Sequence, residues 1–225
     1  RIPPGGIETN PGGLAVIWAE ENSRDALFAA MRRREAYATS GTRPIVRAFA
    51  GRFARSMCSD PEFVRTGYRR GVPMGGDLKT AAAGKAPTLL IRAIRDVDGA
   101  NLDRIQVIKG WLDAAGKPQE KVYDVAWSGN RKPDAKGKLP AVGSSVNVAE
   151  ATYDNSIGSP ALQVFWKDPS FDPKQRAFYY VRVLEIPTPR WTTYDAKFFK
   201  VKLPTDVPAS IQERAYTSPI WYTPG

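Results

Sequence analysis

The sequence predicts a mainly β protein with some α structure, in which an antiparallel β-sandwich follows a helix-and-strand segment. Six segments after residue 87 are rich in β-branched and aromatic residues, which is typical of strands. They recur at intervals of roughly 10 to 20 residues and are separated by glycine, proline, aspartate and asparagine, which favour turns. A segment near the N-terminus instead has the apolar spacing of a helix.

A helix is predicted over about 23–38 and a strand over about 44–50. Asn22 is a good N-cap, because its side-chain oxygen can accept hydrogen bonds from free backbone N–H groups. Asp25 places a carboxylate near the positive end of the helix. Pro44 forbids renewal of the helix, and the β-branched, alternating sequence IVRAFA indicates the strand.

The chain is predicted to have three parts. Residues 1–50 hold the helix and the strand, residues 51–87 form an irregular excursion with one short helix near Pro61 to Tyr68, and residues 88–225 form the β-sandwich. The predicted sandwich strands are TLLIRAIR, RIQVIKGWL, KVYDVAW, SVNVAEATY, ALQVFW and AFYYVRVLEI, with TSPIWYT returning to a sheet edge.

Composition limits the possible chemistry. The chain has no histidine, which excludes serine–histidine and cysteine–histidine catalysis within it, and Cys58 is the single cysteine, which excludes an internal disulfide. The formal net charge of +10 would concentrate anionic partners, whether a substrate, a nucleic acid or a membrane surface. The chain contains no apolar run long enough to span a bilayer.

The first candidate site is the sequence DVDGANLD. It carries four oxygen-bearing side chains around a glycine that allows a sharp bend, so a hard cation such as Ca²⁺ could be wrapped there. The spacing differs from that of an EF-hand, and an Asx-stabilised turn between two strands is the favoured alternative. The four candidate metal ligands are Asp96, Asp98, Asn101 and Asp103.

Two further groups are candidates for substrate binding. Ser40, Thr42 and Arg43 offer hydroxyls and a guanidinium, which suit a phosphate, although a plain helix-to-strand turn explains the same residues. The second group is Arg190, Trp191 and Tyr194, where prolines at 187 and 189 predict an extended path that presents the tryptophan ring. That ring could stack on a ligand or fill a joint between domains.

Long strings in the chain carry a resemblance to a known family. They are WAEENSRDALFAAMRRREAYATSGTRP, GVPMGGDL, DGANLDRIQVIKGWLD, KVYDVAWSG, FDPKQRAFYYVRVLEIPTPRWTTYDA and ERAYTSPIWYTP. Together they resemble the C-terminal part of a secreted bacterial family of unknown function, related to the PHP (polymerase and histidinol phosphatase) metal-dependent phosphoesterases.

The resemblance implies a longer protein whose preceding barrel holds divalent metals such as Zn, Mn or Mg, and which acts on an anionic small molecule. The segment 1–50 would complete that barrel. No cofactor is expected within this chain, because the histidine ligands of the family are absent from it. The resemblance also implies a periplasmic or secreted location. On this interpretation the chain is an accessory part, catalytically inactive by itself, and its partner is the missing barrel.

Two other functions stay open. A carbohydrate- or surface-binding module is indicated by a sandwich that carries several tryptophans. A single-strand nucleic-acid binder is indicated by the positive charge together with the aromatic content, since such proteins combine phosphate contacts with base stacking. The basic residues are scattered over many loops, however, so nucleic acid is the least favoured partner.

Overall fold

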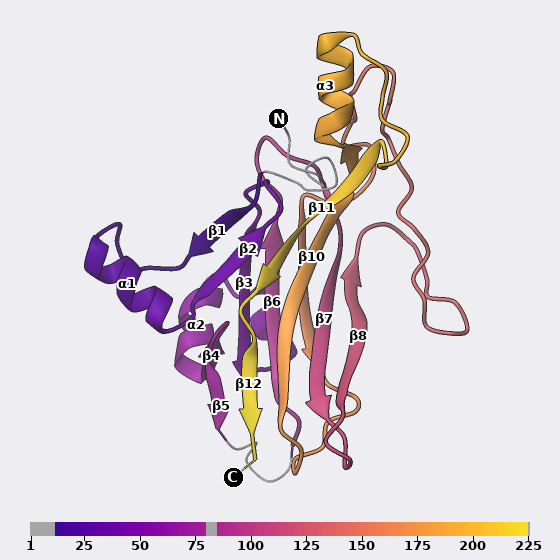
Figure 1. Ribbon diagram of the computed structural model, residues 1–225. Coiled ribbons are helices and arrows are strands. Elements are labelled where there is room, and N and C mark those ends of the chain that lie inside the picture. Colours follow the sequence, from indigo (N-terminus) through magenta and orange to yellow (C-terminus); the bar gives the residue numbers. More distant parts are fainter. Residues whose placement is uncertain (1–11, 80–84, 225) are drawn as a thin grey trace.

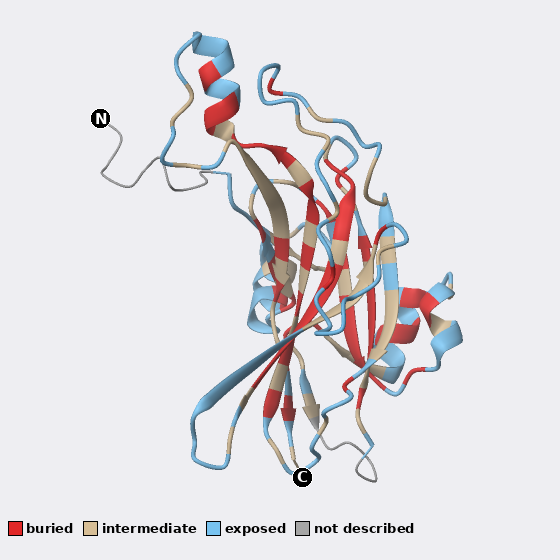
Figure 2. Cartoon of the chain, turned by 90° about the vertical axis from the view of Figure 1, so that its right-hand side faces the viewer, coloured by how far each residue is buried: buried red, intermediate tan, exposed pale blue. Residues whose placement is uncertain are grey.

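The computed structural model describes residues 12–79 and 85–224 (Figure 1). Within these residues two β-sheets pack face to face around a common core, and the predicted mainly β, sandwich-like fold is confirmed. Inward-facing residues of both sheets build the core, among them Val46, Ile91, Val107 and Val181. Figure 2 shows that the buried residues follow the strands through the middle of the molecule.

The larger sheet is organised around one long strand, β10. On one side β10 pairs with β7 along most of its length, and on the other side it pairs first with β12 and then with β11. The pairs are antiparallel except for β12 with β5. The strands of this sheet are β1 (Leu14–Ile17), β2 (Ala36–Thr39), β5 (Asp77–Lys79), β7 (Leu102–Leu112), β8 (Pro118–Trp127), β10 (Ala177–Pro189), β11 (Ser210–Thr217) and β12 (Ile220–Thr223).

The smaller sheet has the strand order β4-β3-β6-β9 and is antiparallel throughout. The predicted strand over about 44–50 is found here as β3, one residue displaced. Alternate residues of these strands face the larger sheet, as the period of two requires. The four strands are β3 (Ile45–Gly51), β4 (Gly71–Pro73), β6 (Thr88–Ile94) and β9 (Ala161–Lys167).

The first helix is shorter than predicted. Helix α1 spans Arg24–Arg32, is capped by Ser23 rather than Asn22, and ends before Arg34, which has a positive φ of 60°. The residues that follow form β2, although the helix was predicted to continue to about 38. The strand forms because residues 36–39 pair with β1 on one side and β11 on the other, a tertiary contact that local helix propensity does not contain.

The excursion over 51–87 contains more regular structure than predicted. A 3-10 helix, η2 (Arg55–Ser59), precedes α2 (Phe63–Arg70), which confirms the short helix predicted near Pro61 to Tyr68. Glycine at 67 lets α2 approach β3 closely, since a Cβ there would lie 2.5 Å from the ring of Phe49. Phe49, Phe63 and the buried Cys58 belong to a second apolar cluster between these helices and the smaller sheet.

One strand prediction over the second half of the chain was wrong, and two elements were not predicted. The sequence SVNVAEATY is not a strand and contains one isolated bridge, Asn147 to Thr152. Strand β11 was not predicted. The extended path predicted at Pro187 and Pro189 is present as the end of β10, and helix α3 (Trp191–Phe199), which begins directly after Arg190, was not predicted. Among the described residues, no helix has the length and apolar character needed to cross a membrane.

Candidate functional site

A cleft of about 440 Å³ lies at one end of the sandwich, and we call it the α3 cleft. Its walls are the start of α3, the end of β10, two residues of β11, and residues of the loops that follow β2 and β6 and that precede β9, at the end of the molecule where α3 projects (Figure 1). The lining residues with charged, hydroxyl or aromatic side chains are Thr42, Arg43, Asp96, Asp98, Tyr153, Glu185, Thr188, Arg190, Trp191, Tyr194 and Glu213.

The α3 cleft unites residues from all three of the predicted candidate groups. The polar turn after β2, the aspartate-rich turn after β6 and the aromatic segment at α3 are far apart in the sequence, and each places side chains in the lining. The strands that precede these segments end at the same end of the sandwich, which explains why the three segments lie together. The predicted residues that line the cleft are Thr42, Arg43, Asp96, Asp98, Arg190, Trp191 and Tyr194.

Three predicted site residues lie outside the lining. Ser40 hydrogen-bonds the backbone of Arg214, with its hydroxyl oxygen 2.8 Å from the amide nitrogen, and so extends the pairing of β2 with β11. Asn101 donates from its side-chain amide to the backbone oxygens of residues 155 and 157. Asp103 forms ion pairs with Arg104 and Arg131, at 3.0 and 2.6 Å. These contacts fix strands and loops.

The aspartate-rich turn is an Asx turn held by an arginine. Asp96 accepts from the backbone N–H of Asp98 and from the backbone N–H and Nε of Arg43, at 3.2, 2.8 and 3.2 Å. Burial opposes ionisation of Asp96, but these hydrogen bonds outweigh it and lower the pKa of the carboxyl. The guanidinium of Arg43 also reaches Asp98, at 3.3 Å. Across the described ranges, no group of three or more acidic or cysteine side chains is placed to hold a metal ion.

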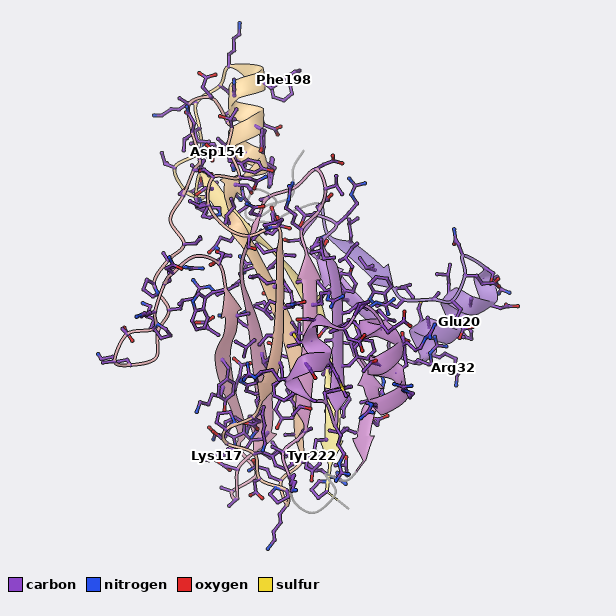
Figure 3. The ribbon with its side chains drawn as sticks, turned by 180° about the vertical axis from the view of Figure 1, so that it is seen from behind. Glu20, Arg32, Lys117, Asp154, Phe198 and Tyr222 are labelled. Atoms are coloured by element: carbon purple, nitrogen blue, oxygen red, sulfur yellow. The ribbon has the colours of Figure 1, made fainter. Side chains whose placement is uncertain are left out.

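The start of α3 carries the aromatic side of the cleft. Arg190 is buried, donates to the hydroxyl of Thr192 at 3.2 Å, and holds its guanidinium carbon 5.3 Å from the ring centre of Trp191. Tyr194, one turn further, is 43% exposed. Lys197 donates to the Glu150 carboxylate at 2.9 Å, which ties α3 to the loop beside it. The far end of the helix is exposed, with Phe198 at its tip (Figures 2 and 3).

Glu185 completes the site and was not predicted from the sequence. It is 1% exposed, and its Oε1 accepts a 2.7 Å hydrogen bond from the hydroxyl of Thr42. Burial raises the pKa of this carboxyl to about 7; the Thr42 hydrogen bond opposes the rise, and the nearby charges of Glu213 and Asp96 add to it. The only signal in the sequence is a single glutamate inside the apolar run AFYYVRVLEI.

Comparison with known families gives one match. A family model described as "Protein of unknown function (DUF3604)" matches residues 4–224. The chain belongs to this family. Membership of a family of unknown function was predicted from the sequence and is confirmed, and the DUF3604 match includes every residue that lines the α3 cleft. The relation to PHP phosphoesterases and the secretion of the protein stay predictions. No curated protein and no solved structure matches the chain.

Proposed function

We propose that this chain is the ligand-binding accessory part of a larger metal-dependent hydrolase, and that the α3 cleft binds a polyhydroxylated group such as a sugar residue. The observation that carries the proposal is the composition of the cleft wall. Aromatic rings at 153, 191 and 194 stand beside carboxyl and hydroxyl groups in a single hollow. Such a combination suits a ligand that has both an apolar face and several hydroxyls.

The charges of the lining favour a neutral ligand. Two guanidiniums, of Arg43 and Arg190, stand beside four carboxyl groups. The guanidinium of Arg43 is already paired with Asp96 and Asp98, so its charge is largely compensated. Carboxylates accept hydrogen bonds from hydroxyl groups, whereas they repel a phosphate. A sugar hydroxyl therefore fits this wall better than an anion does.

The hydrolase part of the proposal rests on the resemblance to the PHP-related family. In that family the divalent metals would be held by histidines and aspartates of a preceding barrel, and this chain would contribute binding rather than metal chemistry. The exposed apolar side of α1 supports such a partner, since Phe28 and Met31 are 57% and 51% exposed. α1 extends from the body beyond β1, between Glu20 and Arg32 (Figures 1 and 3). A periplasmic or secreted location is proposed on the same resemblance.

A phosphate ester is the second candidate ligand, because both guanidiniums of the cleft lie in its wall. A sugar phosphate would combine the two chemistries. Single-stranded nucleic acid is the least favoured ligand. The net charge of +10 would attract its phosphates, but a net charge does not indicate a groove in which a strand could bind.

The test is a binding survey with a matched pair of tryptophan variants. Glucose, galactose, cellobiose, maltose and glucose 6-phosphate are titrated into the chain and followed by ligand-observed NMR and calorimetry. Trp191→Ala removes the ring in the cleft, and Trp221→Ala removes a 41% exposed ring on β12, outside the lining. Loss of a stacking ring weakens binding by about 1–3 kcal/mol where stacking has been measured on nucleic-acid bases.

The proposal requires that at least one neutral sugar binds, that Trp191→Ala weakens this binding at least tenfold and that Trp221→Ala leaves it unchanged. Binding of glucose 6-phosphate alone would establish the anionic alternative instead. If none of the five probes binds, or if the two variants behave alike, the α3 cleft is not a sugar site. Activity toward a phosphate ester with added Mn²⁺ or Zn²⁺ is expected only from a longer polypeptide that includes the barrel.

A further inference from the structure

Glu185 is buried near the end of β10, where the sandwich opens into the α3 cleft. Tyr179, Val181 and Val183 precede it at every second position and are buried in the core. The alternation ends at Glu185, because the pairing of β10 shifts register after Leu184 and both Glu185 and Ile186 are buried. A buried carboxyl is costly, because burial removes the water that stabilises its charge. Such a group is normally matched by a buried cation or by several hydrogen-bond donors.

The buried carboxyl of Glu185 has only some of the hydrogen-bond partners that it needs. Thr42 donates to Oε1, but Oε2 has no hydrogen-bond partner among the described residues, and no lysine or arginine of that part of the chain forms an ion pair with Glu185. Oε2 is also closed off from bulk water. The outer torsion of a glutamate is broad, so the carboxyl can turn toward a group that enters the cleft at small cost.

Among the described residues, the charged and titratable groups around Glu185 add no cation paired with its carboxyl. The loops after β2 and β6 contribute Arg43, Asp96 and Asp98, and these three pair with one another. Glu213 of β11 and Tyr153 of the loop before β9 also line the cleft, and the charges of Glu185 and Glu213 act on neighbouring tyrosines. From α3 and the residue before it come Tyr194 and Arg190, and Arg190 lies over the Trp191 ring.

We infer that Glu185 is the specificity-determining residue of the α3 cleft, and that its carboxylate Oε2 accepts a hydrogen bond from a hydroxyl of a polyhydroxylated ligand. This inference rests on the proposed function of the cleft and names the group that recognises the ligand. Thr42 donates to the other oxygen, Oε1. The unpartnered oxygen then gains the donor that the folded chain does not supply.

The inference makes binding dependent on pH. In the empty cleft Glu185 holds a proton below about pH 7, because burial raises its pKa. The ligand hydroxyl donates to the ionised form, so binding below that pH releases one proton from Glu185 to solvent. Linkage then strengthens binding as the pH rises toward 7, by at most tenfold for each pH unit, and the affinity levels off above about pH 8.

The experiment compares Glu185→Gln with Glu120→Gln. Both changes replace a carboxylate by an amide and keep the size of the side chain. Glu120 is exposed on β8 and lies outside the cleft lining. The probe is whichever of glucose, galactose, cellobiose or maltose binds the unmodified chain. Its affinity is measured by calorimetry from pH 5 to 8.5, in two buffers of different ionisation enthalpy, which reports the protons released.

In Glu185→Gln the amide oxygen still accepts from Thr42, so the amide nitrogen faces the ligand donor. This variant is expected to lose at least tenfold in affinity at pH 8 and to show no dependence on pH, whereas Glu120→Gln retains both. Proton release by the unmodified chain tests the same point without any variant. If a sugar binds and depends on Trp191 but the pH profile is flat and no proton is released, Glu185 is not the recognising group, although the cleft remains the site. If no sugar binds, both proposals fail.

Discussion

Replacement of Glu185 by glutamine is expected to stabilise the fold at pH 8.5 and to leave it nearly unchanged at pH 4.5. The carboxyl has a pKa of about 7 in the folded protein against an ordinary value of 4.5. Each tenfold difference between the two ionisation constants corresponds to about 1.4 kcal/mol, so ionisation of Glu185 lowers the free energy of unfolding by about 3 kcal/mol.

The sign of the effect follows from proton binding. Between about pH 4.5 and 7 the folded chain holds a proton on Glu185 that the unfolded chain has released, so stability falls as the pH rises through this interval and is constant above it. Glutamine cannot ionise, and its oxygen still accepts from Thr42. The advantage of the variant should therefore grow from near zero at pH 4.5 to about 3 kcal/mol above pH 8.

Urea unfolding followed by tryptophan fluorescence, at half-unit steps from pH 4.5 to 8.5, measures this difference. The window is favourable because the chain has no histidine, the side chain that ordinarily changes its charge within it. Glu120→Gln serves as the control for loss of an exposed carboxylate. Parallel stability profiles for the unmodified chain and Glu185→Gln would refute the reasoning, as would an advantage that appears only in acid.

Three further outcomes are expected. Lys109→Met should destabilise the fold by about 3–5 kcal/mol in urea unfolding, because Asp168, which lies 2.7 Å from the Lys109 ammonium, would be left buried without a cation. Adding Asp168→Asn should restore part of the lost stability. A loss below about 1 kcal/mol for Lys109→Met would contradict a buried ion pair between these two residues. Gly67→Ala should cost about 1–3 kcal/mol because its Cβ would meet the Phe49 ring, whereas Val64→Ala on the exposed side of α2 should cost little. Asp96→Asn should lower stability at pH 6, and the loss should shrink as the pH falls below the ordinary value of 3.8, since the lowered pKa of Asp96 stabilises the fold only where its carboxyl is ionised; a loss that stays constant down to acid unfolding would contradict this reasoning.

The sandwich was predictable because its strands are marked locally. Segments such as TLLIRAIR and AFYYVRVLEI carry β-branched and aromatic residues throughout, and the structure contains both as β6 and β10. Strand β11 was missed because its centre, Gln212-Glu213-Arg214, is polar, and it is a strand because β10 and β2 pair with it on both sides. The end of α1 was missed for the same reason, since residues 36–39 are recruited by β11.

The cleft was predicted in pieces but not as a whole. Arg43, Asp96 and Trp191 each stood in a recognisable polar or aromatic segment, yet nothing in their spacing indicated that the three segments meet. Glu185 could not be singled out, because its role depends on burial and on a hydrogen bond to Thr42, 143 positions away. Properties of that kind arise from the packed structure and are invisible in a linear pattern.

The pairing of β2 with β11 has a consequence for the order of events during protein synthesis. Ser40 and Arg214 bond to each other across 174 positions. At a translation rate of roughly 5–20 residues per second, the N-terminal strand waits on the order of 10–35 s for its neighbour. Hairpins such as β7–β8 can close within that time, but the wall formed by β11 and α3 cannot. The cleft is therefore among the last features of the chain to be assembled, and until then the edge of β2 stays open to other strands.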